Sequence, residues 1–223
     1  MRLLAAALAI LLAPAIALAH PHIWISQKVR VIARDGKFTH VEIEWRFDPY
    51  SSEDEIPAID EDGDGKVSAD EAKALAADML PELQKNGFLT WLNAGAKDFR
   101  PSKLPTLVVR IDDPASFTPP DWDHDEGDKD KGAGMPMPPN KQVIRPAPVP
   151  RGPRNLAYVM RFELAEPGKT VSITTYDPED FIRIEVDKAS LPAACTLAKH
   201  PTYKSEFVPG KPVFADTVSC RLP

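Results

Sequence analysis

The chain has 223 residues, a formal net charge of −6 and a hydrophobic content of 43%, so it is long enough for one domain with insertions. An acidic chain without basic clusters disfavours nucleic acid and anionic lipid surfaces as partners and favours cations. Only two cysteines are present, and they are not in a C-x-x-C arrangement, so redox catalysis is not indicated.

Residues 1–19 have the features of a signal peptide. Arg2 supplies the positive start, Leu3 to Ile16 is an apolar run, and Ala17-Leu18-Ala19 offers small residues for cleavage. The apolar run is too short to span a bilayer comfortably, which disfavours the alternative of a retained anchor. We therefore expect an exported protein that is not membrane-embedded, with a mature chain of residues 20–223.

Cleavage after Ala19 would place a free amine on His20, and His22 follows two residues later. The amine and the two imidazoles form a nitrogen-rich set that suits Zn²⁺, Ni²⁺ or Cu²⁺ rather than Ca²⁺. The sequence therefore predicts a transition-metal site at His20 and His22. The alternative is that both histidines simply begin a strand.

The next segment predicts a β-hairpin. Residues 23–33 and 38–47 largely alternate between apolar and polar residues, and Asp35-Gly36 between them is a common hairpin turn. The hairpin ends at residues 48–52, which lead into an insert that we assign to residues 49–87.

Within this insert, residues 60–71 match the EF-hand calcium loop. Carboxylates fall at loop positions 1, 3, 5 and 12, and glycine falls at position 6, where the chain must turn sharply. Position 7 contributes a backbone carbonyl, and position 9 acts directly or through a water. The predicted Ca²⁺ ligands are Asp60, Asp62, Asp64, Lys66, Ser68 and Glu71. The alternative is an acidic turn that binds no ion.

The flanks of the loop predict helices of unequal quality. After the loop, an apolar stripe at helical spacing comprises Ala72, Leu75, Ala76, Met79, Leu80 and Leu83, and Asn86-Gly87 is a stop signal. Before the loop, Pro57 biases Ile56 away from helical geometry, so the entering helix should be short or begin late. A single loop in an exported protein indicates a structural ion of modest affinity.

The remainder predicts further strands. Alternating segments recur at residues 88–92, 107–111, 156–164, 170–176 and 181–186, and short strands surround Cys195 and residues 213–220. Residues 112–153 are rich in Pro, Asp and Met, and we interpret them as a long disordered loop. The predicted fold is mainly β, an antiparallel sandwich-like domain over residues 20–223 with a helical EF-hand insert, and α+β overall.

An even cysteine count in an exported chain indicates a disulfide between Cys195 and Cys220 that would join the last strands. The alternative is a pair of free thiols.

Several features then occur together: the start at residues 20–25, the strand end at residues 44–48, the acidic insert, the Tyr176-Asp177-Pro178 turn and the C-terminal cysteines. In these the chain resembles the bacterial periplasmic family catalogued as domain of unknown function 1007. The resemblance implies a periplasmic location, a description as the periplasmic component of an ABC-type transport system, and an association with nickel, cobalt or zinc transport.

The leading hypothesis is a Ca²⁺-binding periplasmic protein that acts as a binding or accessory component in transition-metal transport or homeostasis, with a membrane transporter as partner. The alternative is an extracytoplasmic scaffold whose Ca²⁺ is purely structural. A copper enzyme built on the terminal histidines ranks third. The motifs typical of nucleophilic, phosphate-binding or zinc-helix enzymes are absent from the sequence, so we expect no enzymatic activity.

Overall fold

The computed structural model describes residues 23–94, 97–103, 105–112, 154–208 and 210–223. Its elements in chain order are β1 (Ile23–Arg34), β2 (Lys37–Phe47), α2 (Pro49–Ile59), α3 (Ala69–Lys85), η1 (Gly87–Leu89), β3 (Thr90–Ala94), β4 (Lys97–Phe99), β5 (Thr106–Asp112), β6 (Asn155–Gly168), β7 (Thr170–Thr175), β8 (Ile182–Val186), η3 (Lys188–Ser190), β9 (Cys195–Val208) and β10 (Lys211–Arg221). The protein is mainly β, as the alternating segments predict. The expected loop at 112–153 lies outside the described residues except for Asp112, which ends β5.

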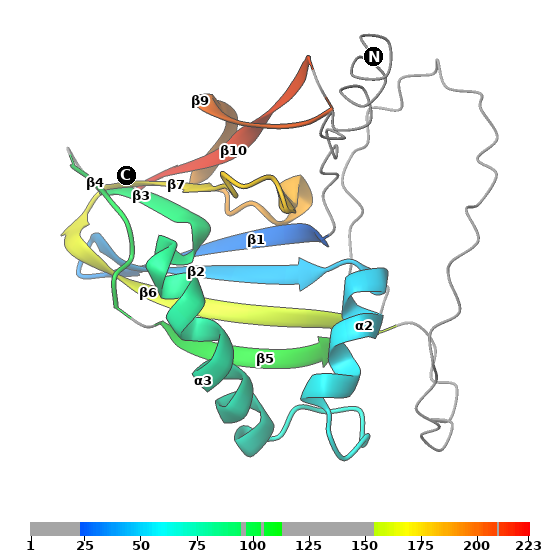
Figure 1. Ribbon diagram of the computed structural model, residues 1–223. Helices are drawn as coiled ribbons and strands as arrows, with labels where there is room; N and C mark the ends of the chain where they lie inside the picture. The colour runs from blue at the N-terminus through cyan, green and yellow to red at the C-terminus, as the bar shows by residue number, and fades with distance from the viewer. Residues whose placement is uncertain (1–22, 95–96, 104, 113–153, 209) are drawn as a thin grey trace, which may run out of the picture.

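The strands form two five-stranded sheets, ordered β5-β6-β2-β1-β8 and β4-β3-β7-β10-β9 (Figure 1). The expectation of antiparallel pairing is correct with one exception among the described strands, because β8 runs parallel to β1. The exception arises where the chain leaves β7 in the second sheet and enters the first sheet at its edge. There Ile182 lies opposite Ile23, and the two strands continue in the same direction.

The hairpin of β1 and β2 forms as predicted. Asp35 and Gly36 have φ angles of 51° and 70°, the left-handed geometry that matches a two-residue turn to the twist of the strands. Further along, Gln27 lies directly opposite Trp45, and the Trp45 indole Nε1 donates a hydrogen bond to Gln27 Oε1 at 3.0 Å. Gln27 is only 1% exposed, so this polar pair lies within the core.

One apolar core lies between the two sheets and the helices. The first sheet contributes Ile43, Trp45 and Met160, and the second contributes Leu92, Ile173 and Val218. The helices α2 and α3 lie against the β5–β6 end of the first sheet (Figure 1). The two helices therefore cover apolar surface near the β5 edge of the first sheet.

Helix α2 begins earlier than the sequence indicates. Asp48 is its N-cap and accepts hydrogen bonds from the backbone N–H groups of Tyr50 and Ser51, and Pro49 occupies the first turn. The helix continues through Pro57 to Ile59, so the expectation of a short or late helix is wrong. Proline removes one intrahelical hydrogen bond, but burial of Ile56 and Ile59 in the core holds the last turn in place.

Helix α3 follows the predicted stripe. Leu80 is buried, and the other stripe residues (Ala72, Leu75, Ala76, Met79 and Leu83) are partly buried against the core. The helix runs through Pro81 and ends at Lys85, and Gly87 follows with a φ of 55°. The predicted stop is therefore confirmed, because glycine readily adopts this left-handed geometry.

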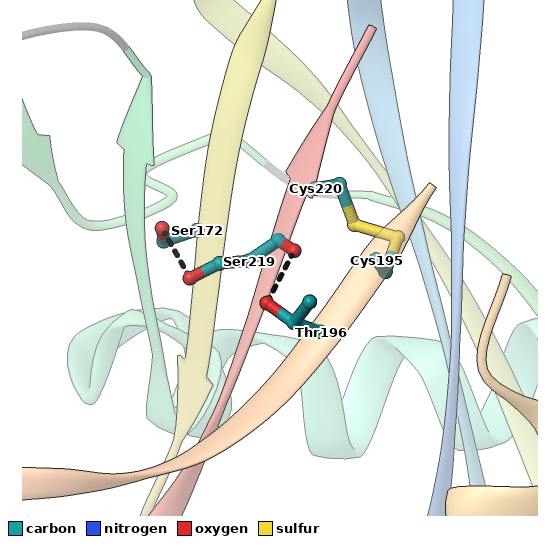
Figure 2. Close-up of a disulfide and its surroundings, with 5 residues drawn as sticks. All are labelled: Ser172, Cys195, Thr196, Ser219 and Cys220. Atoms are coloured by element: carbon teal, nitrogen blue, oxygen red, sulfur yellow. Dashed lines mark hydrogen bonds between the residues drawn. A yellow bond between two sulfur atoms is a disulfide. The ribbon is translucent and has the colours of Figure 1, made fainter. Parts of the chain in front are cut away.

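The C-terminal strands are longer than predicted. Instead of short strands, β9 and β10 form a long antiparallel hairpin in which Cys195 lies directly opposite Cys220. These cysteines form a disulfide, with Cα atoms 4.0 Å apart. Figure 2 shows the disulfide beside two hydrogen bonds between neighbouring strands: the Ser172 and Ser219 hydroxyls pair with each other, and the Thr196 hydroxyl donates to the Ser219 carbonyl. The predicted disulfide is thus present, and it joins the open end of the last hairpin.

Candidate metal centre

The segment between α2 and α3 is fixed at both ends by helix caps. Asp60 is the C-cap of α2, and its N–H donates to the Ile56 carbonyl at 2.8 Å. Ser68 is the N-cap of α3: its hydroxyl accepts the Glu71 N–H at 3.3 Å, and Glu71 Oε2 accepts the Ser68 N–H at 2.8 Å. This reciprocal capping box places the Glu71 carboxylate at the start of α3, facing back toward the loop.

The loop itself turns on glycines and aspartates. Gly63 and Gly65 have φ angles of 71° and 85°, which glycine adopts without steric cost. Asp62 Oδ1 accepts the Asp64 N–H at 3.0 Å, and Asp64 Oδ1 accepts the Lys66 N–H at 2.7 Å. Each aspartate therefore bonds the backbone two residues further on, a local turn that curls the chain.

Three of the predicted ligands converge in this loop. Carboxylate oxygens of Asp60, Asp62 and Glu71 all lie within 4.8 Å of one another. Oxygens at this spacing can share one hard cation, because carboxylates bind Ca²⁺ at 2.3–2.6 Å. The three residues come from the end of α2, the loop and the first turn of α3, so an ion held between them would join both helices.

Asp60 differs from its neighbours because it is buried. The residue is 5% exposed, and its Oδ2 atom accepts the Gly65 N–H at 3.0 Å and a guanidinium N–H of Arg154 at 3.3 Å. Its Oδ1 atom is also buried but accepts no hydrogen bond from the described residues. A buried carboxylate oxygen without a donor is costly unless a cation faces it.

Glu71 is held in its charged form. Hydrogen bonds from the backbone and hydroxyl of Ser68 lower the pKa of the Glu71 carboxyl, and the N–H groups of Glu61 and Asp62 add to the effect. The Glu61 N–H donates to Glu71 Oε1 at 2.8 Å. The carboxylate is therefore ionised well below neutral pH, as a cation ligand requires.

The other predicted ligands occupy different roles in the structure. The close group of oxygens does not include Asp64, whose Oδ1 atom is bonded to the Lys66 N–H. The Ser68 hydroxyl caps α3. The role of the Lys66 carbonyl as a ligand stays a prediction.

Arg154 is the residue that sequence reasoning missed at this site. It lies 94 residues from Asp60 along the chain, just before β6. No spacing rule connects a lone arginine to a loop so far away, so only the fold brings them together.

The second predicted metal site cannot be placed, because His20 and His22 lie outside the described residues. Of the histidines within them, His40 Nδ1 lies 2.9 Å from the Thr39 hydroxyl, and His200 Nδ1 accepts the Tyr203 N–H at 2.9 Å. Both contacts are local, because each partner lies within three residues of its histidine.

A family model described as "Protein of unknown function (DUF1007)" matches residues 5–209. The chain belongs to the DUF1007 family. The match covers every described element of this DUF1007 protein from β1 to β9, including both helices and the acidic loop, and ends before β10; it confirms the family resemblance. Searches of curated proteins and of solved structures gave no match.

Within the described part of this DUF1007 protein, no helix combines the length and apolar character that crossing a bilayer requires.

Proposed function

We propose that this protein binds Ca²⁺ through an EF-hand formed by α2, residues 60–71 and α3. The observation that carries the proposal is the convergence of Asp60, Asp62 and Glu71 oxygens within 4.8 Å, with the buried Asp60 Oδ1 lacking a hydrogen-bond donor among the described residues. The helix–loop–helix order and the two left-handed glycines support the same assignment.

The ligand chemistry favours Ca²⁺ over softer metals. The close group contains only carboxylate oxygens, which are hard ligands, and no His or Cys belongs to it. An ordinary EF-hand loop reaches six to eight oxygens by adding a backbone carbonyl and water. We assign the remaining ligands to the Asp64 carboxylate, the Lys66 carbonyl and Ser68, directly or through a water. We propose that Asp64 turns its second carboxylate oxygen toward the ion.

The ion has a structural role in this proposal. It would tie the end of α2 to the start of α3, and the apolar stripe of α3 packs directly on the β core. Ca²⁺ would therefore stabilise the whole β5–β6 end of the framework. Affinity in the range of about 10⁻⁴–10⁻³ M is sufficient for such an extracytoplasmic site.

We further propose that the protein is periplasmic and serves transition-metal transport or homeostasis as a non-enzymatic accessory component of a membrane transporter. Support comes from the leader at residues 1–19 and the candidate nitrogen ligands His20 and His22. The second candidate function is an extracytoplasmic scaffold with Ca²⁺ alone, and the packing of α3 on the core favours a structural ion in either case.

Isothermal titration calorimetry of the leader-free protein with CaCl₂ tests the Ca²⁺ proposal. We expect one site in the wild type and at least tenfold weaker binding in Glu71→Gln, which keeps the capping box because glutamine also caps at this position. Glu82→Gln is the matched control, since Glu82 lies on the same helix and pairs with Lys85. Absence of a heat signal from millimolar Ca²⁺ in the wild type would refute the proposal.

Elemental analysis of protein purified without chelators separates the two candidate functions. An accessory component for metal transport should retain Zn²⁺, Ni²⁺ or Cu²⁺. A scaffold should retain none of these metals, whether or not its weaker Ca²⁺ site is occupied.

A further inference from the structure

Arg154 forms an ion pair with the most buried acidic residue of the loop. Its Nη1 lies 3.3 Å from Asp60 Oδ2, and the two side chains are 29% and 2% exposed respectively. A charge pair shielded from water in this way interacts far more strongly than one on the surface. The guanidinium is therefore a permanent part of the electrostatic environment of the loop.

The two oxygens of Asp60 have different partners. Oδ2 accepts the Gly65 N–H at 3.0 Å and the Arg154 guanidinium, whereas Oδ1 is buried and accepts no hydrogen bond from the described residues. Arg154 thus binds the oxygen that is not available to a cation. It acts on an ion through Asp60 and through its own charge, without occupying a ligand position.

Arg154 is held in place by the residues that follow it. The Asn155 amide donates to the Phe47 carbonyl at 2.7 Å, and the Leu156 N–H donates to the Ser52 hydroxyl at 2.9 Å. Asn155 and Leu156 are both fully buried. The backbone at the start of β6 is therefore anchored to β2 and α2, and the positive charge cannot easily move away when a cation arrives.

We propose that Arg154 is a positioning residue that tunes the affinity and valence selectivity of this site; the inference rests on the proposed Ca²⁺ function. Its fixed charge makes the binding free energy of a cation less favourable by an amount proportional to the charge of the ion. At a separation of about 6 Å, a unit charge weakens binding of a divalent ion by about tenfold even at the dielectric constant of water, and of a trivalent ion by about thirtyfold.

The opposing effect of losing a hydrogen bond is smaller. Gly65 N–H continues to hold Asp60 Oδ2 when Arg154 is replaced, so Oδ1 keeps its orientation. Removing the charge should therefore strengthen cation binding, although removal of a buried partner commonly weakens the fold. This sign distinguishes electrostatic tuning from simple structural support, which would predict weaker binding.

The test is a titration of the whole leader-free chain, residues 20–223, with CaCl₂ and, separately, with TbCl₃. Arg154→Met removes the charge at similar length, and Arg154→Lys retains it. Arg161→Met is the matched control, because Arg161 pairs with Glu42 further along β6 and its loss changes the net charge equally. We expect Arg154→Met to bind Ca²⁺ about tenfold and Tb³⁺ about thirtyfold more tightly than the wild type. Arg154→Lys and Arg161→Met should stay within about threefold of the wild type.

Each result decides the question. Equal or weaker Ca²⁺ binding by Arg154→Met overturns the role of Arg154 while leaving the Ca²⁺ site intact. Equal gains in affinity for Ca²⁺ and Tb³⁺ also overturn the role of Arg154, since an electrostatic effect must grow with the charge of the ion. If the wild type binds neither ion, the proposed function fails and this inference fails with it. Should Arg154→Met fold poorly, Arg154→Gln and the dependence of the melting temperature on Ca²⁺ concentration give the same comparison.

Discussion

Asp48 connects the β framework to the helix that precedes the candidate metal loop. Its Oδ1 accepts the N–H groups of Tyr50 and Ser51 at 2.9 and 3.1 Å. Its Oδ2 accepts the Trp24 N–H at 3.0 Å and the Ser51 hydroxyl at 2.6 Å. The residue is 5% exposed. Replacing Asp48 with alanine would remove four hydrogen bonds in a site that water cannot easily enter.

The size of the effect follows from these contacts. Loss of an N-cap costs about 1 kcal/mol, and leaving the backbone N–H of Trp24 without this acceptor costs about 1–3 kcal/mol more. We therefore expect Asp48→Ala to lower the free energy of unfolding by about 3 kcal/mol. For a chain of this length, that corresponds to a fall in melting temperature of about 6–12 °C.

Thermal unfolding followed by circular dichroism in EDTA measures this difference. Ser68→Ala is the internal comparison, because Ser68 caps the exposed start of α3 with a single hydroxyl acceptor. That variant should lose only about 1 kcal/mol. If Asp48→Ala is destabilised no more than Ser68→Ala, burial does not strengthen the Asp48 cap and the reasoning fails.

Two further predictions concern the disulfide and pH. The Cys195–Cys220 bond joins positions 25 residues apart, so the Cys195→Ala, Cys220→Ala double variant should lose about 3.5 kcal/mol in denaturant unfolding; wild-type unfolding that is insensitive to reductant would contradict this. The pKa of Glu71 is lowered in the folded state, mainly by Ser68. In EDTA its contribution to stability should be fully present above the unfolded pKa of about 4.5 and disappear as the pH falls through the lower folded value. Glu71→Gln should flatten this part of the stability–pH curve, and an identical curve in both proteins would argue against the effect.

Local patterns in the sequence predicted local structure well. The hairpin at Asp35-Gly36, the apolar stripe of α3 and its stop at Gly87 each depend on residues within a few positions of one another. The convergence of Asp60, Asp62 and Glu71 is also local, because all three lie between residues 60 and 71 of the chain. The disulfide needed no spacing rule, since only one cysteine pair exists.

The errors arose where distant contacts decide the outcome. Pro57 lowers the local preference for helix, but the Asp48 cap and the burial of Ile56 and Ile59 outweigh it. The parallel entry of β8 beside β1 depends on where the chain crosses between sheets, which alternation does not encode. Arg154 reaches Asp60 only because β6 is packed against α2 and β2.

The buried contact between Gln27 and Trp45 has a consequence for how the first hairpin assembles. Shifting β1 by one residue would turn Gln27 away from the core and bring Ser26 or Lys28 opposite Trp45, whereas shifting it by two would leave both the Gln27 amide and the Trp45 indole without their partner in an apolar environment. Each shifted register therefore costs free energy, because the amide–indole hydrogen bond forms only in the observed register. The alternating aliphatic side chains and the Asp35-Gly36 turn favour the same register, and the amide–indole contact adds a penalty for shifts by two residues, which alternation alone would tolerate.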